Sequence, residues 1–423
     1  MTEDRVLISS RNFDVPDACH LPKALERGAY QGLRKALTMN PDDIVAEVRK
    51  SKLRGHGGAG FPAGVKWGFV PKDIDKPKYL CVNADESEPG TCKDRLILEK
   101  DPHLLLEGIA ITCFAIGIHT AYVYIRGEYH HPTRIFNDAI QEAREAGYLG
   151  KNILDSGFNL EVYTHPGAGM YICGEETGLI ESLEGKKGWP RIKPPFPAVV
   201  GVFNCPTVVN NVETIAYVPS IIMNGGDWFL NLGTPNSGGT MLFSVSGHVN
   251  KPGVYEYPVG TTLRTIIYDV AGGIRGDKKL KAVIPGGSSA PILTPDEIDV
   301  PMDFDAMMEI GTMLGSAGII VIDQDTPMID VLFWLSRFYA HESCGQCTPC
   351  REGTAWLFKI VTRIKEGRGR DGDLDLMLDL CDKIEARTIC PLGAAAAMPI
   401  RAMIKKFRPE FEQEIQKANT TAA

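Results

Sequence analysis

The sequence has no excess of positive charge. Its 423 residues contain 45 lysines and arginines against 53 aspartates and glutamates, for a formal net charge of −8. A general nucleic-acid binder needs a basic face that replaces phosphate counterions, so this class of protein is excluded. Hydrophobic residues make up 44% of the chain and charged residues 23%. These values lie near the globular average and exclude a mostly disordered, collagen-like or coiled-coil protein.

A long hydrophobic run is also lacking. The best candidate for a membrane span is the segment 108–125, which has no Asp, Glu, Lys or Arg but contains His119. It ends in a β-branched and aromatic pattern, so we expect a buried helix followed by a buried strand, and no membrane insertion. The N-terminus is acidic without an apolar stretch, so neither a signal peptide nor a mitochondrial presequence is expected.

Common hydrolase and nucleotide-phosphatase motifs are missing too. The chain has no G-x-S-x-G, no H-E-x-x-H and no Walker loop, so serine hydrolase, zinc protease and P-loop hypotheses lack support. His130 and His131 are adjacent and would point apart on a helix or a strand, which makes them poor paired ligands.

The order of apolar patterns predicts an α/β protein. Residues 22–53 fit two helices, and a glycine-rich loop and a strand at 79–83 follow. Helices and strands then alternate, at 102–117, 121–126, 132–147 and 160–165. Such alternation is typical of a mainly parallel sheet.

Two further regions follow this α/β part. The segment 232–239 has the composition of a linker, and short strands around one helix then predict a small α+β module that ends near residue 325. From Pro327 onward, four amphipathic stretches predict a helical bundle. The expected domains are therefore residues 1–235, 236–326 and 327–423.

The eleven cysteines favour metal ligation over disulfides, because the chain carries no export signal. Cys344, Cys347 and Cys350 form the C-x2-C-x2-C run that iron–sulfur clusters use, and a Cys-Pro step often supplies the remaining ligand. Cys390 precedes a proline in a predicted loop, whereas Cys381 shares a helical face with apolar residues, so Cys390 is the expected fourth ligand. Zinc bound by four cysteines and buried free thiols are the alternatives.

The segment RGHGGAGFPAGVKWGF at 54–69 is rich in glycine. Its G-x-G-x-x-G pattern follows a helix and not a strand, so a standard dinucleotide-binding phosphate loop is rejected. Glycines interspersed with Phe61, Trp67 and Phe69 still suit a backbone surface for a flat ligand, and Lys66 could meet a phosphate. A plain cluster of turns is the alternative.

Two acidic segments are expected near the same ligand. Residues 83–95 follow a strand, at the edge where open α/β sheets bind ligands, and Asp85, Glu86 and Glu88 suit hydroxyl or ring N–H donors better than phosphates. A solvated acidic loop is the alternative. Residues 160–177 predict a strand, a glycine turn and a helix start that presents backbone N–H groups.

A basic, proline-rich loop follows at 184–198. It places four lysines and arginines beside Trp189 and Phe196. Such a loop could steer an anionic dinucleotide and stack its adenine, or it could be a solvated run of charge.

Together these segments resemble the flavin-bearing, NADH-oxidising subunit of respiratory complex I, whose family also supplies the diaphorases of NAD-linked hydrogenases and formate dehydrogenases. The shared motifs occur in the family's order over nearly the whole chain, namely GGAGFPAGVKW, NADESEPGTCKDR, YICGEET, KPPFPA, PTVVNNVETI, PGGSS and ESCGQCTPCREG. The resemblance implies a Rossmann-like α/β domain for FMN and NADH, a small ubiquitin-like (β-grasp) α+β domain, and a C-terminal four-helix bundle with a [4Fe–4S] cluster.

The resemblance also implies an enzyme activity and its residues. Hydride would pass from NADH to non-covalent FMN, and single electrons would leave through the cluster towards quinone. The residues that would bind FMN or NADH are Gly55, His56, Gly57, Gly58, Phe61, Lys66, Phe69, Asn83, Asp85, Glu86, Ser87, Tyr171, Gly174, Glu175, Glu176, Lys193, Phe196, Asn210, Asn211 and Thr214. Glu88 would tune the flavin, and the cluster ligands would be Cys344, Cys347, Cys350 and Cys390. His56 and Ala63 depart from the family's usual Arg and Thr.

The implied partners are a thioredoxin-like [2Fe–2S] subunit and a large iron–sulfur subunit. The chain would sit in the cytoplasm, on the inner face of a bacterial plasma membrane through its complex, in preference to a mitochondrial matrix. Two alternatives stay open: the diaphorase of a hydrogenase or formate dehydrogenase, and a zinc-bearing scaffold without catalysis.

Overall fold

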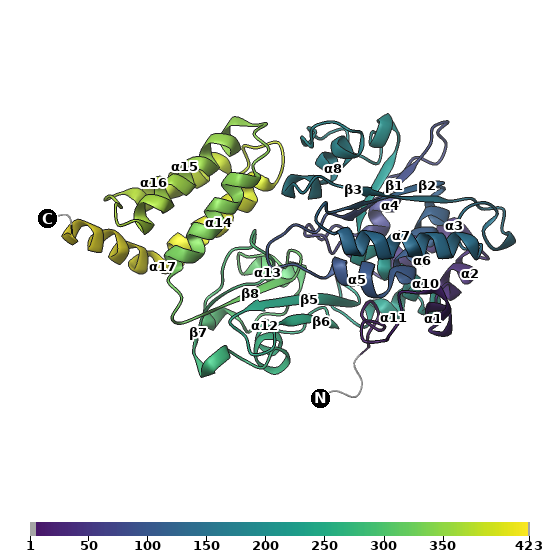
Figure 1. The fold of residues 1–423 in the computed structure, drawn as a ribbon, viewed down its shortest axis with the longest axis horizontal. Coiled ribbons are helices and arrows are strands. Elements are labelled where there is room, and N and C mark those ends of the chain that lie inside the picture. The colour runs from purple at the N-terminus through teal and green to yellow at the C-terminus, as the bar shows by residue number, and fades with distance from the viewer. Residues whose placement is uncertain (1–5, 422–423) are drawn as a thin grey trace.

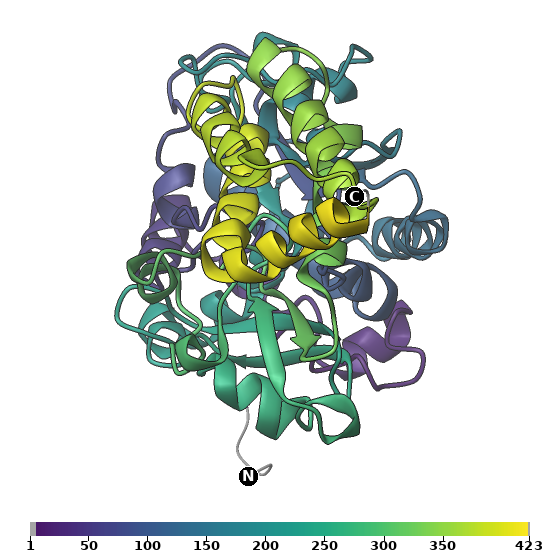
Figure 2. The same cartoon turned by 90° about the vertical axis from the view of Figure 1, so that its left-hand side faces the viewer.

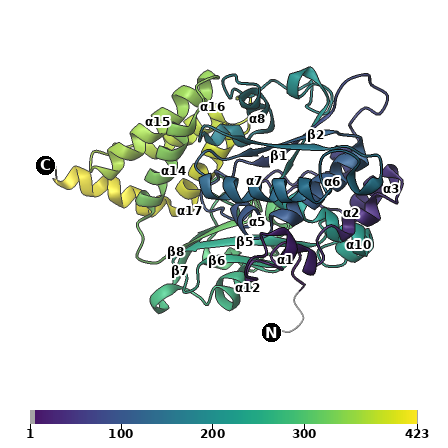
Figure 3. The same cartoon turned by 45° about the vertical axis from the view of Figure 1, so that its right-hand side comes forward.

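The computed structural model describes residues 6–421. Two four-stranded sheets and a C-terminal group of helices follow one another along the chain (Figure 1). The C-terminal helices lie at the opposite end of the molecule from the N-terminal ones (Figures 1 and 3). Within the described residues, no helix combines the length and the apolar character needed to cross a bilayer.

The first sheet is parallel throughout, as the alternation of helices and strands predicts. Its order is β3-β2-β1-β4. The strands are β1 (Tyr79–Ala84), β2 (Thr120–Ile125), β3 (Glu161–Pro166) and β4 (Thr207–Asn211). Successive side chains of a strand point to opposite faces. Leu80 and Val82 of β1 therefore pack into one hydrophobic core, and Cys81 between them packs into another.

Helices cover both faces of this sheet. The apolar segment that begins at residue 108 is α6 (Pro102–Ile116) followed by β2, and almost every residue of the helix is buried. Asp101 caps its start and Gly117, with a φ of 68°, ends it. The remaining helices of this part are α4 (Ala63–Trp67), α5 (Asp94–Lys100), α7 (His130–Glu145), α8 (Glu176–Leu183), α9 (Val212–Ala216), α10 (Val218–Asn224) and α11 (Gly226–Leu230).

The N-terminal region differs from the prediction of two helices. It forms three, α1 (Leu21–Glu26), α2 (Gln31–Ala36) and α3 (Pro41–Lys50). The break between the first two comes from left-handed backbone at Gly28 and Tyr30, whose φ values are 87° and 64°. An apolar pattern with helical spacing does not reveal such a break in the helix, because the side chains before and after the break still face the core.

The second sheet has the order β6-β5-β8-β7, with β5 and β8 parallel and the outer pairs antiparallel. Its strands are β5 (Thr240–Gly247), β6 (Gly253–Pro258), β7 (Leu280–Ile284) and β8 (Gly318–Asp323), and its helices are α12 (Leu263–Thr265) and α13 (Phe304–Glu309). The segment 232–239 is tightly packed: a Cβ on Gly239 would lie 2.0 Å from the Phe229 ring.

Four helices form the C-terminal part, as predicted. They are α14 (Met328–Glu342), α15 (Thr348–Lys365), α16 (Asp373–Ile384) and α17 (Leu392–Thr421), and α14, α15 and α16 all contact α17 or one another (Figure 2). Pro399 and Pro409 lie within α17, and the backbone leaves helical geometry at Phe407.

Candidate functional site

The carboxyl ends of β1 and β4 form the edge on which the site is built. The strands pair in register, so that Asn83 lies opposite Asn211. A loop of residues 54–62, here called the glycine loop, closes on itself where the Gly55 amide donates to the Phe61 carbonyl at 2.9 Å. A Cβ on Gly57 would lie 3.1 Å from the Asn211 Cβ, so this loop packs directly on the end of β4.

His56 is placed behind the glycine loop. Its side chain is fully buried against Glu213, and its backbone N–H donates to the Thr214 Oγ1 at 2.9 Å. Thr214 is also fully buried, so neither side chain reaches the open face of the loop. Gly58, in contrast, has no atom within 4 Å of a Cβ position. The loop therefore offers backbone, and not His56 or Thr214, to a ligand.

Aromatic side chains stand exposed beside this loop. Phe61 and Phe69 are 44% and 57% exposed, and their ring centroids lie 6.2 Å apart. Phe61 and Phe69, next to a glycine-rich backbone, are therefore available to stack on a planar ligand. Phe196, in the loop after α8, is also exposed, at 58%.

The segment after β1 holds a buried carboxyl group with an unpaired oxygen. Asn83 Nδ2 donates to the Gly174 carbonyl at 2.8 Å and thereby joins this segment to the turn before α8. Asp85 is buried, and its Oδ2 has no hydrogen-bond partner. Burial raises the pKa of Asp85 to about 7, although Arg126 opposes the shift. Ser87 turns back to donate to the Asp85 carbonyl.

Glu86 and Glu88 are already engaged by the protein. Glu86 Oε1 accepts from the backbone N–H groups of Lys93 and Asp94, each at 2.8 Å, where α5 begins. Glu88 Oε2 accepts from the Tyr171 hydroxyl at 2.6 Å, and its Oε1 accepts from the Ser289 amide at 2.8 Å. Glu88 thus connects the first sheet to the loop after β7.

Lysines neutralise the two glutamates at the start of α8. Lys193 Nζ lies 2.8 Å from Glu175 Oε1 and 2.8 Å from Glu176 Oε1. Lys66 Nζ donates to the Val209 carbonyl at 3.1 Å and lies 3.4 Å from Glu176. Burial would raise the pKa of Glu176, but Lys66 and Lys193 outweigh it and lower that pKa.

At the helix start at 176, two of the backbone N–H groups expected to face a ligand are bonded within the protein. Glu175 caps α8, because its Oε2 accepts from the amides of Thr177 and Gly178 at 2.8 and 2.9 Å. The sequence pattern locates the turn and the helix correctly, but it does not reveal that the Glu175 side chain accepts hydrogen bonds from the first backbone N–H groups of the helix.

The four cysteines expected as cluster ligands lie in and beside two loops of the C-terminal part. Cys344 and Cys347 lie between α14 and α15, Cys350 is in the first turn of α15, and Cys390 lies between α16 and α17. Burial raises the pKa of Cys390 to about 12, and the proximity of Cys344 and Cys350 adds to the shift. Cys381 lies inside α16, fully buried in the core.

These thiols are close without forming a single-ion site. Among residues 6–421, no three His, Cys, Asp or Glu side chains are grouped as one metal ion requires. Cys347 and Cys344 add to the raised pKa of Cys350, and Cys344 and Cys350 add to that of Cys390, so the cysteines of the two segments are near enough to interact electrostatically.

Two hydrogen bonds join the flavin-type region to the cysteine loop. Trp189 Nε1 donates to the Cys344 carbonyl at 3.2 Å. The Tyr171 amide donates to Glu342 Oε2, at the end of α14, at 3.0 Å. The residues expected around a flavin and those expected around a cluster therefore lie in adjacent parts of one chain.

Comparison with known proteins accounts for both regions. Residues 48–220 match the Nuo51 FMN-binding domain, 330–414 match the NADH-ubiquinone oxidoreductase-F iron–sulfur binding region, and 241–322 match the SLBB domain. The chain is 55% identical to an F-type subunit of the NADH-quinone oxidoreductase of Rhizobium meliloti, over 96% of this chain and 97% of that protein. The chain belongs to the family of F-type NADH-quinone oxidoreductase subunits.

Other members of this family match over similar lengths. The Rickettsia massiliae protein is 52% identical over 94% of each chain, and that of Mycobacterium tuberculosis H37Rv is 50% identical over 97% of this chain and 93% of that one. Among solved structures, an NAD+-reducing [NiFe]-hydrogenase matches with a TM-score of 0.83 and 37% identity over 92% of this chain. The chain spans 64% of the length of that hydrogenase chain. FMN, the [4Fe–4S] cluster and NADH are the cofactors and substrate of the family to which the chain belongs.

Sequence reasoning missed the buried charges behind the glycine loop. Lys93 and Glu213 are paired at 2.7 Å, and both are almost completely buried. Nothing in their local patterns distinguishes them from surface residues, because they lie far apart in the chain and meet only when it folds.

Proposed function

We propose that this chain is the electron-input subunit of an NADH-quinone oxidoreductase. The observation that carries the proposal is the junction of Trp189 with Cys344 and of Tyr171 with Glu342, which puts the flavin-type and cysteine regions side by side. FMN bound here would supply the hydride acceptor for NADH, and a [4Fe–4S] cluster would supply one-electron transfer to the partners.

The residues around the glycine loop fit FMN. The unpaired Asp85 Oδ2 is an acceptor in need of a donor, which ribityl hydroxyl groups supply. The open space at Gly58 and the close packing of Gly57 suit a ligand that lies flat on backbone. Lys66 supplies positive charge at this edge. The FMN residues would be Gly55, Gly57, Gly58, Lys66, Asn83, Asp85, Ser87, Tyr171, Gly174, Glu175, Asn210 and Asn211, with His56, Glu86 and Thr214 acting from behind.

The exposed side of the same edge fits NADH. Phe61, Phe69 and Phe196 would flank the dinucleotide, Lys193 would attract its phosphates, and Glu176 would bind hydroxyls. Glu88 would hold Tyr171 and the loop after β7 in place and so tune the flavin. No side chain is required as a nucleophile.

The cysteine loops fit a [4Fe–4S] cluster held by Cys344, Cys347, Cys350 and Cys390. Cluster binding would have to displace the thiol protons, because burial raises the pKa of Cys350 to about 11 and favours the neutral thiol. We assign the flavin region to residues 1–235, a ubiquitin-like module to 236–326 and a four-helix bundle to 327–423.

The partners would be a thioredoxin-like [2Fe–2S] subunit and a large iron–sulfur subunit on the inner face of a bacterial plasma membrane. A hydrogenase-type diaphorase is the second candidate, because the hydrogenase named above shares the fold at 37% identity. The 55% identity to the Rhizobium meliloti protein over almost the full length of both chains favours the quinone-linked function.

An anaerobic visible spectrum of the full chain, co-expressed with its natural neighbours, tests the proposal. We expect flavin bands over a broad iron–sulfur absorbance, which bleach with NADH and not comparably with NADPH. A colourless, zinc-containing protein that stays colourless after addition of FMN and reconstitution with iron and sulfide would overturn it.

A further inference from the structure

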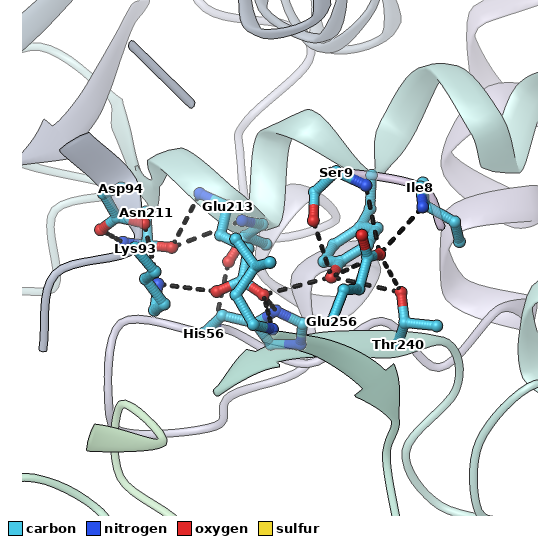
Figure 4. Close-up of polar contacts among 12 residues, drawn as sticks. Ile8, Ser9, His56, Lys93, Asp94, Asn211, Glu213, Thr240 and Glu256 are labelled. Carbon is cyan, nitrogen blue, oxygen red and sulfur yellow. Dashed lines mark hydrogen bonds and ion pairs between the residues drawn. The ribbon is translucent and has the colours of Figure 1, made fainter. Parts of the chain in front are cut away.

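A network of buried polar contacts lies behind the glycine loop and is centred on Glu213 of α9 (Figure 4). Glu213 is 0% exposed. Its Oε1 lies 3.1 Å from His56 Nδ1 and accepts from the Leu242 amide of β5 at 2.8 Å. Its Oε2 lies 2.7 Å from Lys93 Nζ. One carboxylate thus contacts the glycine loop, the segment before α5 and the second sheet.

The same group of charges is tied to the end of β4. Lys93 Nζ also lies 2.8 Å from Asp94 Oδ1. Asp94 Oδ2 accepts from Asn211 Nδ2 at 2.6 Å, and Asn211 in turn caps α9. The glycine loop, the segment before α5 and the end of β4 are therefore all bound to this group.

Glu213 is an anion in this setting. Burial would raise the pKa of Glu213, but Lys93 and His56 outweigh it and hold the pKa at about 2. A buried charge is costly unless it is paired, so loss of this carboxylate leaves Lys93 and His56 to find new partners. Because Gly57 packs on Asn211 and His56 is fixed to Thr214, the loop has little room to absorb such a change.

We propose that Glu213 is a positioning residue of the flavin site, which aligns the glycine loop through His56 and the segment 83–95 through Lys93. The inference rests on the proposed function. A reduced flavin gains negative charge, and charges act strongly in a buried setting. The paired charges of Lys93 and Glu213 behind the loop therefore set both the affinity for FMN and its reduction potential.

The test compares Glu213→Gln with Glu256→Gln in the full chain co-expressed with its neighbours. Glu256 is the matched control, because it is also buried and accepts from the Ile8 amide at 3.0 Å, at the other end of the network in Figure 4. Its contacts include neither His56 nor Lys93, and the Tyr217 hydroxyl, 3.5 Å from Glu256 Oε1 and 3.2 Å from Glu213 Oε1, links it to Glu213. FMN is added to flavin-depleted protein, and its Kd is measured by fluorescence quenching.

We expect Glu213→Gln to weaken FMN binding by about tenfold or more, since a buried hydrogen-bonded charge is lost. It should also shift the flavin potential measured by spectroelectrochemical titration. Glu256→Gln should lower the melting temperature but leave FMN affinity and potential close to the wild-type values. Equal FMN affinity in Glu213→Gln and wild type, or equal weakening in both variants, would overturn the inference.

Two variants of His56 keep the inference testable if Glu213→Gln does not fold. His56→Arg places a charged donor beside Glu213, whereas His56→Gln places a neutral one. We expect the potential and affinity of the arginine variant to lie nearer the wild-type values, and identical behaviour of the two would count against the inference. If wild-type protein binds no FMN under the same conditions, the proposed function itself fails.

Discussion

The flavin region and the cysteine region satisfy their polar groups in opposite ways. Around the glycine loop, lysines pair with glutamates and Glu175 caps a helix, so most partners are supplied by the chain itself. In the C-terminal part, burial and neighbouring thiols raise the pKa values of Cys350 and Cys390. The first region therefore satisfies its charged groups without a cofactor, whereas the second holds protonated thiols that metal binding has to deprotonate.

Removal of one cysteine thiol from the cluster site should have the largest effect, and it should affect only the cysteine region. We expect Cys390→Ala to abolish the cluster, because the other three ligands come from a single stretch and cannot close the coordination. Flavin content and its reduction by NADH should be largely retained. Iron and acid-labile sulfide analysis, together with anaerobic bleaching of the flavin bands, measures both effects.

Cys381→Ala serves as the matched control for this variant. Cys381 is fully buried within α16, so its truncation should lower stability while the iron content is preserved. Loss of iron in Cys381→Ala but not in Cys390→Ala would reverse the ligand assignment. Loss of flavin reduction in a folded Cys390→Ala protein would contradict the independence of the two regions.

Asp85 is the exception within the flavin region, because its Oδ2 is left unpaired. Its pKa is raised to about 7 in the folded chain. The unfolded chain therefore releases this proton first, near pH 4, and the free energy of unfolding falls as pH rises from about 4 to about 7. In flavin-free protein, this loss should approach about 4 kcal/mol.

Asp85→Asn should remove that loss of stability. We expect the variant to be more stable than wild type at pH 8, similar to it at pH 4, and weaker in FMN binding because the carboxylate acceptor is gone. Urea unfolding at both pH values measures the first effect. A wild-type minus variant difference that does not vary with pH would contradict the shifted pKa.

How far the sequence predicts this molecule depends on the range of the contacts involved. Strands β1, β2 and β3, helix α6 and the four C-terminal helices follow from local apolar patterns, which indicate burial on one or both faces, whereas β4 is not predicted. The same patterns do not reveal β8, although Gly318–Asp323 lies at the centre of the second sheet, because a short apolar run has no helix-or-strand signature.

The site shows the same limit more sharply. Motifs locate the glycine loop and the cysteines, but they do not reveal that His56 points inward or that Glu213 and Lys93 form a pair. Those facts depend on contacts between residues far apart in the chain. A fully buried lysine is too rare to be expected from a sequence in which it stands between polar neighbours.

The smallest expected effect concerns the contact between the flavin region and the cysteine region. Trp189→Phe removes the hydrogen bond to the Cys344 carbonyl while it keeps an aromatic ring. A single such bond is worth about 1 kcal/mol, so the fold should persist and the cysteine loop should open slightly more often. We expect the cluster to lose iron to a chelator about fivefold faster, in keeping with that energy, while flavin reduction by NADH stays unchanged.

Trp356→Phe on α15 is the control, since Trp356 is 49% exposed on a different surface. Equal rates of iron loss in the two variants would mean that the cluster holds its loop without help from the flavin region, and the contrast between the two regions would then extend to their boundary.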